Sequence, residues 1–157
     1  MQPERSLREL EHARAVRSMF SGIARRYDLL NHVLSGNTDK RWRRKVRALL
    51  EDILADENAV VLDVACGTGD LSIELKTNAN ARVIGSDFCH PMLAVAREKT
   101  ERIPWIEGDA LSMPFGDESF NAVTIAFGLR NLANFRDGLV ELRRILKPGG
   151  RLVVLEF

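Results

Sequence analysis

Small and acidic residues whose types could hold a nucleoside ligand gather in one stretch of the chain, residues 59–70. Asp63 lies at the end of an apolar, β-branched run that is typical of a buried parallel strand. Gly67, Thr68 and Gly69 form a loop after it, and Asp70 begins a pattern with helical spacing. Because glycine accepts backbone conformations closed to other residues, such a loop lets a ligand approach the main chain. The stretch therefore predicts a ligand site at the carboxyl end of a strand.

The charges beside this loop indicate which nucleoside it would bind. A dinucleotide fingerprint needs G-x-G-x-x-G, and Ser72 stands at the third glycine position. The carboxylates of Asp63 and Asp70 flank the loop and would repel a pyrophosphate there. A ligand with an ammonium and a sulfonium group but no phosphate fits better, and S-adenosyl-L-methionine is such a ligand.

Two further polar positions follow the next predicted strands. Residues 81–88 form a second strand that ends near Asp87, about 20 positions past the glycine loop, where an acidic residue accepts hydrogen bonds from ribose hydroxyls. Residues 103–110 form a third strand, whose end offers the Asp109 carboxylate and the Ala110 amide to an adenine ring. The sequence thus predicts cofactor contacts at Asp63, Gly67, Gly69, Asp87, Asp109 and Ala110.

The alternation of strand and helix patterns predicts an α/β fold with a Rossmann-like, doubly wound, mostly parallel sheet. A fourth strand covers residues 121–128, and a fifth covers residues 151–157 after a turn at Lys147-Pro-Gly-Gly150. An apolar strand at an open sheet edge is an aggregation hazard. We therefore expect either that the chain is a fragment or an early-terminating gene model, or that another chain covers this edge, as in a homodimer.

The residues before the first strand form a separate N-terminal part. We expect residues 1–56 to be a helical lid or substrate segment and residues 57–157 to be the cofactor-binding core. Residues 1–18 read as a loose or helical arm, followed by one helix over residues 18–31 and another that starts at Thr38. The basic run from Lys40 to Arg47 is either a solvated helix surface or a face attracted to an anionic membrane.

Composition excludes several classes of function. The net charge of the 157-residue chain is +1, which gives no electrostatic case for a nucleic-acid partner. Its two cysteines form no C-x-x-C motif and suit a reducing cytoplasm. Three scattered histidines lack metal-ligand spacing, so no metal is expected. No apolar run approaches the length of a membrane span.

Longer motifs carry a family resemblance. Asp63-x-Ala-x-Gly-x-Gly69 with Asp87 and Asp109-Ala110 resembles class I S-adenosylmethionine-dependent methyltransferases. Arg26-Tyr-Asp-Leu-Leu-Asn31 and Phe127-Gly-Leu-Arg-Asn131 are more specific and resemble the ubiquinone/menaquinone biosynthesis C-methyltransferases. The resemblance implies methylation of a ring carbon of a lipid-soluble polyprenyl quinol, either demethylmenaquinol or the benzoquinol of the ubiquinone pathway. It also implies cofactor contacts at Thr68, Asp87, Asp109 and Ala110. Family members continue beyond the fifth strand.

Such a reaction needs a group that makes the ring carbon nucleophilic. A quinol carbon becomes reactive when a neighbouring hydroxyl loses its proton. Arg130, just after the fourth strand, would lower the pKa of that hydroxyl by its charge, and a surface ion pair is its structural alternative. His32 has the intrinsic pKa of a base, and a capping or core role is its alternative. Both are candidate catalytic residues.

Other functions stay open on sequence grounds. A base-modifying nucleic-acid methyltransferase would show an Asn/Asp-Pro-Pro-Tyr-like tetrad after the fourth strand, where this chain has Phe127-Gly-Leu-Arg130. An NAD-dependent oxidoreductase is disfavoured by Ser72 and the flanking carboxylates. Methylation of another small molecule and a non-catalytic S-adenosylmethionine-binding module are the remaining alternatives.

Overall fold

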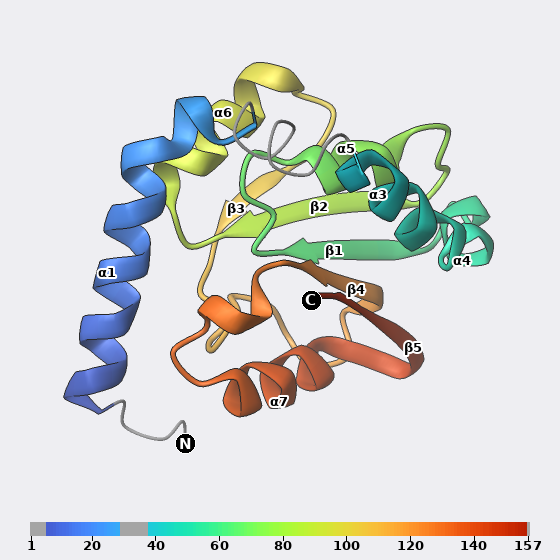
Figure 1. Ribbon diagram of the computed structural model, residues 1–157. Coiled ribbons are helices and arrows are strands. Elements are labelled where there is room, and N and C mark those ends of the chain that lie inside the picture. The colour runs from blue at the N-terminus through green and yellow to red at the C-terminus, as the bar shows by residue number, and fades with distance from the viewer. Residues whose placement is uncertain (1–5, 29–37, 157) are drawn as a thin grey trace.

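The computed structural model describes residues 6–28 and 38–156, which include a five-stranded parallel sheet (Figure 1). The strands are β1 (Val60–Val64), β2 (Arg82–Asp87), β3 (Trp105–Glu107), β4 (Phe120–Ala126) and β5 (Leu146–Leu155). They lie in the order β3-β2-β1-β4-β5, and each pairing between neighbours is parallel. The order reverses between β1 and β4, and ligands of such sheets bind beyond the carboxyl ends of the strands at this point. The predicted fold class is confirmed.

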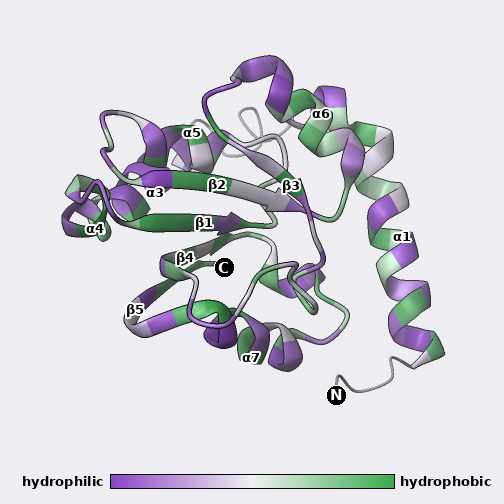
Figure 2. Cartoon of the chain, turned by 180° about the vertical axis from the view of Figure 1, so that it is seen from behind, coloured by the Kyte–Doolittle hydropathy of each residue, from purple (hydrophilic) through white to green (hydrophobic). Residues whose placement is uncertain are grey.

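Helices cover both faces of the sheet and its carboxyl edge. They are α1 (Leu7–Ile23), η1 (Ala24–Arg26), α3 (Thr38–Ala48), α4 (Glu51–Ala55), α5 (Asp70–Lys76), α6 (His90–Lys99), η2 (Leu129–Asn131) and α7 (Phe135–Ile145). In Figure 1, α3, α5 and α6 lie on one side of the sheet and α7 on the other. Helix α1 stands across the edge toward which the strands point, so the N-terminal segment lies over the carboxyl ends of the strands (Figures 1 and 2).

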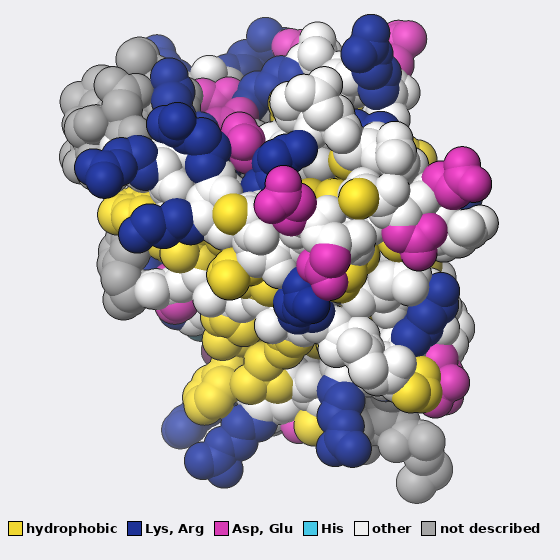
Figure 3. All heavy atoms as spheres, turned by 90° about the vertical axis from the view of Figure 1, so that its right-hand side faces the viewer, with side chains coloured by type: hydrophobic (Ala, Val, Ile, Leu, Met, Phe, Trp, Pro, Cys, Tyr) yellow, Lys and Arg dark blue, Asp and Glu magenta, His cyan; other side chains and the backbone are white. Residues whose placement is uncertain are grey.

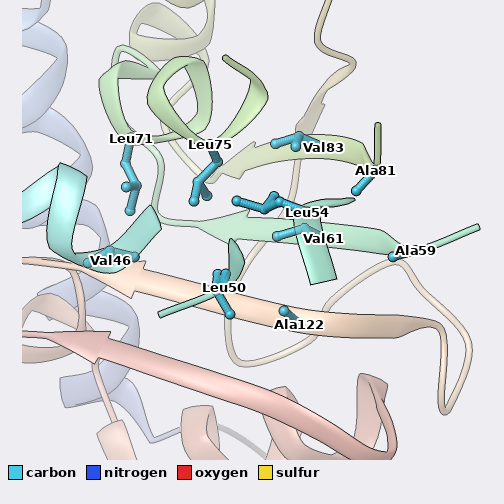
Figure 4. Close-up of a cluster of buried hydrophobic side chains, with 10 residues drawn as sticks. All are labelled: Val46, Leu50, Leu54, Ala59, Val61, Leu71, Leu75, Ala81, Val83 and Ala122. Atoms are coloured by element: carbon cyan, nitrogen blue, oxygen red, sulfur yellow. The ribbon is translucent and has the colours of Figure 1, made fainter. Parts of the chain in front are cut away.

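Alternate residues of the strands build two cores. Val61, Val83 and Ala122 face α3, α4 and α5, whose apolar side chains complete one cluster (Figure 4). The opposite face carries Leu62 and its neighbours, which pack against α7 and the connection before β4. Both faces are buried, which explains why the strands are hydrophobic along most of their length (Figure 2). The sheet and its helices therefore form a rigid support for the loops at the carboxyl edge.

Several boundaries differ from those expected from sequence. The arm is an ordered helix from Leu7, because Ser6 and Glu9 form a capping box at its start. The helix expected over residues 18–31 is divided between the end of α1 and η1 as far as Arg26, and residues 29–31 lie outside the described part of the chain. Strand β3 has three residues rather than eight. Strand β5 already begins at Leu146, with a register shift between Phe120 and Ala122 of β4.

The two predicted parts of the chain are closely packed. Val46 of α3, Leu50 just before α4, and Leu54 of α4 belong to the same buried cluster as Val61 of β1. The boundary between residues 56 and 57 stays a prediction, but the second half of the N-terminal part packs as a layer of the core.

The outer side of β5 pairs with no other described strand. Val154 is 41% exposed there, and hydrophobic side chains form a band down this side of the molecule (Figure 3). Within residues 6–28 and 38–156, no helix has the length and apolar character needed to cross a membrane.

Candidate cofactor site at the carboxyl edge

The loop after β1 has the backbone geometry that its glycines predict. Gly67 and Gly69 have φ angles of +56° and +85°. A Cβ atom on Gly69 would lie 2.3 Å from the Trp105 ring, so glycine is required there by packing as well as by conformation. A Cβ on Gly67 would point into the space toward Tyr27, 3.8 Å from its ring. The loop therefore keeps an open main-chain surface that faces the N-terminal segment.

Asp63 is fixed below this loop by two hydroxyl groups. Ser72 donates to Oδ2 at 2.6 Å and Thr124 donates to Oδ1 at 2.7 Å. Burial raises the pKa of Asp63 to about 6 against the opposing effect of these hydrogen bonds. Ser72, at the position of the missing third glycine, thus orients a carboxylate.

Asp87 connects the end of β2 to the same loop. It is 6% exposed, and its two carboxylate oxygens accept hydrogen bonds from the amides of Gly67 and Cys89, each at 2.8 Å. Burial raises the pKa of Asp87, with these amide hydrogen bonds acting in the opposite direction. Carboxylate oxygens have further lone pairs, so Asp87 can still accept ribose hydroxyls.

Asp109 and Ala110 follow β3, one strand further along the edge. The Asp109 carboxylate accepts a hydrogen bond from the Leu111 amide at 2.9 Å. The Ala110 side chain is buried in the core beneath. The predicted contacts therefore occur in the spatial order β1, β2, β3 along one edge, as an extended ligand requires.

Charged residues of the N-terminal segment close over the loop. Asp28 accepts a hydrogen bond from the Thr68 hydroxyl at 2.5 Å. It also forms an ion pair with Lys99 at 2.5 Å. Lys99 also contacts Asp70 at 2.7 Å, and Arg43 lies 3.5 Å from Asp70. The negative charge that sequence alone assigned to Asp70 is thus balanced by two cations, and the expected repulsion of a phosphate is weaker than predicted.

Two adjoining cavities lie between this segment and the strand ends. One, of about 70 Å³, is lined by Tyr27, Arg43, Asp63, Ala65, Cys66, Gly67, Thr68, Asp70, Leu71, Ala126 and Phe127. The other, of about 40 Å³, is lined by Phe20, Tyr27, Ala65, Gly67, Asp87, Phe88, Met92, Ala126, Phe127, Gly128 and Asn131. The first is rich in charged groups and the second in aromatic ones. Together they offer the charged and aromatic groups that a nucleoside with a charged tail requires.

Comparison with known proteins identifies the family. Residues 7–157 match the ubiE/COQ5 methyltransferase family. The chain belongs to this family. It is 54% identical to a demethylmenaquinone methyltransferase of Thermus thermophilus, over 88% of this chain and 64% of that protein. It is 51% identical to a demethylmenaquinone methyltransferase of Deinococcus radiodurans, over 94% of this chain and 62% of that protein. The chain thus spans somewhat less than two thirds of the length of these curated relatives.

A solved structure supports the fold independently. The crystal structure of a SAM-dependent methyltransferase from Thermotoga maritima matches with a TM-score of 0.68 at 22% identity, covering 88% of this chain and 60% of that one. At this identity the likeness shows the fold. The resemblance drawn from the sequence motifs to the quinone C-methyltransferases is confirmed by the family match.

The structure describes one of the two candidate catalytic residues. Arg130 lies in η2 after β4, where its guanidinium is 3.2 Å from Glu156 and its amide donates to the same carboxylate at 3.3 Å. Its side chain is 49% exposed. The contact with Glu156 is the surface ion pair expected as the structural alternative. His32 lies outside the described residues. Both assignments stay predictions.

Sequence analysis did not single out Arg43, which it placed within a basic run that is either a solvated helix surface or a face attracted to an anionic membrane. The structure turns the Arg43 side chain inward, with 17% exposure, and places it in the lining of the first cavity. The available signal was helical spacing: Arg43 precedes Val46 by three positions and Leu50 by seven, on the buried face of α3. Cys66 also lines this cavity, and burial raises the pKa of its thiol, which disfavours the nucleophilic thiolate.

Proposed function

We propose that this chain forms the cofactor-binding part of an S-adenosylmethionine-dependent C-methyltransferase that converts demethylmenaquinol to menaquinol. The observation that carries the proposal is the arrangement of Gly67–Thr68, Asp87 and Asp109 in strand order beside the two adjoining cavities. The relatives with 54% and 51% identity are both demethylmenaquinone methyltransferases, which favours a naphthoquinol over a benzoquinol.

The residues at the edge fit the cofactor. The open main chain at Gly67, which a Cβ atom would narrow toward Tyr27, suits the amino-acid end. Asp87 would accept the ribose hydroxyls, and Asp109 with the Ala110 amide would bind the adenine ring. Tyr27 and Phe127 line both cavities and would place aromatic faces beside the sulfonium, which such faces attract.

The bound cofactor would supply an electrophilic methyl group. The remaining task of the protein is to hold the quinol carbon in line with that group, to exclude water and to stabilise the phenolate form of the quinol. Phe20, Phe88 and Phe127 give the second cavity an apolar wall that keeps water from the reacting atoms. Arg130 follows β4 on the substrate side, and its guanidinium would stabilise the phenolate by charge and hydrogen bonding.

A lipid-soluble substrate requires access to a membrane. Helix α3 exposes Lys40, Arg41, Arg44 and Lys45, and Leu49 just after it is 60% exposed. Figure 3 shows Lys and Arg side chains gathered at the upper left of the view, where α3 lies. We therefore propose that this basic face of α3 contacts anionic lipid headgroups, at about 1 kcal/mol for each cation near the surface.

Deletion of the gene tests the proposed reaction directly. Mass spectrometry of the quinone pool should show accumulation of demethylmenaquinone and loss of menaquinone. Accumulation of a desmethyl benzoquinone would instead assign the ubiquinone pathway. An unchanged quinone pool, together with calorimetric binding of S-adenosylmethionine by the protein, would favour another small-molecule substrate or a non-catalytic binding module.

A further inference from the structure

Among the described residues that line the first cavity, Arg43 is the positively charged one. Its exposure differs from that of the other cations of α3. Its side chain is 17% exposed, whereas Lys40, Arg41, Arg44 and Lys45 lie on the exposed face. It shares the cavity wall with Gly67 and Thr68. A guanidinium in this position has to be held by a specific partner or to serve a ligand, because burying a charge is costly.

The guanidinium is oriented from within its own helix. Its Nη1 atom lies 2.8 Å from Asp39 Oδ2, one helical turn earlier, and Asp39 is only 6% exposed. The same Nη1 atom lies 3.5 Å from Asp70 Oδ2. Because both contacts use Nη1, neither uses Nη2 or Nε of the planar fork. Among the described residues, these two ion pairs hold the guanidinium through Nη1, and the same side chain lines the first cavity.

The amino-acid end of S-adenosylmethionine needs a partner of this kind. It carries an ammonium and a carboxylate, and the cavity beside the glycine loop offers charges of both signs in Arg43, Asp63 and Asp70. Planar carboxylates pair with guanidinium in a two-point hydrogen-bonded geometry that lysine cannot reproduce. On the basis of the proposed function, we propose that Arg43 binds the α-carboxylate of the cofactor and so selects ligands that carry an intact amino-acid group.

A pair of ligands separates this role from a structural one. Decarboxylated S-adenosylmethionine keeps the adenosine, sulfonium and amine but lacks the carboxylate. Calorimetry should show that Arg43→Gln lowers the affinity for S-adenosylmethionine about 10- to 100-fold, the range for hydrogen bonds to a charged group. Affinity for the decarboxylated ligand should be unchanged. Arg44→Gln, one position along on the exposed face, is the matched control and should affect neither ligand.

The conservative variant guards against loss of folding. Arg43→Lys keeps a cation beside the buried Asp39 but lacks the planar fork, so its preference for S-adenosylmethionine over the decarboxylated ligand should fall between those of wild type and Arg43→Gln. Binding of the decarboxylated ligand also reports that the site is folded.

Three results would contradict the inference. Equal losses for both ligands in the Arg43 variants would show that Arg43 only supports the site through Asp39. Unchanged affinity for S-adenosylmethionine would remove Arg43 from the site. A wild-type protein that binds neither ligand would overturn the cofactor assignment itself, and that result is distinguishable from a failure at Arg43 alone.

Discussion

Thr68 donates its hydroxyl group to Asp28 over 2.5 Å, which joins the glycine loop to a segment 40 residues earlier in the chain. The other carboxylate oxygen of Asp28 lies 2.5 Å from Lys99 of α6. One carboxylate thus connects the N-terminal segment, the loop after β1 and a helix of the core. Thr68 is 2% exposed, so this contact lies beneath the segment rather than at its rim.

Removing the charge of Asp28 should loosen the segment over the loop. In Asp28→Asn, the ion pair with Lys99 is lost and the hydrogen bond from Thr68 is no longer made to a charged acceptor. Because such bonds contribute about 1.5–3 kcal/mol, amide hydrogen exchange over residues 20–28 should become about tenfold faster or more. Glu11→Gln, on the exposed surface of α1, is the control for charge removal. Equal exchange in the two variants would contradict the connection.

The buried Asp63 should make the fold less stable as pH rises. Its pKa is raised by burial to about 6 from a model-peptide value of 3.8. The folded state therefore binds a proton more tightly than the unfolded state, and this contribution to stability is present below pH 3.8 and is lost through pH 6. Between pH 5 and pH 7 the wild type should lose about 1.3 kcal/mol more of its unfolding free energy than Asp63→Asn does.

Urea unfolding of both proteins at several pH values measures this difference. Between pH 5 and pH 7, Asp63→Asn should keep more of its unfolding free energy than the wild type keeps, because the amide does not titrate. Ser72 and Thr124 can turn their hydroxyls to suit this amide. Parallel pH profiles for the two proteins would show that Asp63 does not titrate in this range.

Local sequence patterns predicted the fold and the proximity of several candidate site residues, because each of these features has a local physical cause. Val61 and Leu62 are buried on opposite faces, so β1 reads as a continuous apolar run. The parallel order of strands then brings Asp87 beside Gly67, 20 residues apart, without further information. Strand type and loop position were therefore readable from the sequence.

Features that depend on packing between distant segments were not predictable in this way. The inward orientation of Arg43 depends on how α3 lies over α5, and sequence showed only a basic run. The pairing of Asp70 with Lys99 joins residues 29 positions apart on different helices. The start of β5 was misplaced because Lys147-Pro-Gly-Gly150, expected to be a turn, is part of the strand.

Asp87 should contribute to affinity through the ribose as well as through the loop. Because it also accepts the Gly67 and Cys89 amides, Asp87→Ala alone would mix two effects. We expect this variant to weaken S-adenosylhomocysteine binding by about 1–3 kcal/mol. We also expect the variant to become less sensitive than wild type to removal of the ribose 2′-hydroxyl from that ligand. Calorimetry with both ligands on both proteins gives the coupling free energy between the Asp87 side chain and the ribose 2′-hydroxyl. A coupling of zero would contradict the ribose contact.

Arg130 should affect turnover more than cofactor affinity. Arg130→Ala removes the guanidinium that would stabilise the phenolate, and it also breaks the half-exposed pair with Glu156, which contributes at most about 1 kcal/mol to stability. Glu156→Gln breaks the same pair but keeps the guanidinium, so it separates the two effects. Steady-state methylation of a demethylmenaquinol analogue should fall strongly in the first variant and little in the second. Equal turnover in both variants would assign Arg130 a structural role.

The basic face of α3 should determine binding to anionic membranes. Arg44→Glu/Lys45→Glu reverses two exposed charges, which should reduce partitioning onto phosphatidylserine-containing vesicles by more than the roughly 30-fold expected for loss of two cations at low salt. Arg136→Glu/Arg143→Glu makes the same change in net charge on exposed positions of α7 and should have little effect. Binding of the wild type should also weaken with added salt, because these charges are screened within about 10 Å at 0.1 M. Equal losses in the two double variants would show that net charge, rather than the face formed by α3, governs the contact.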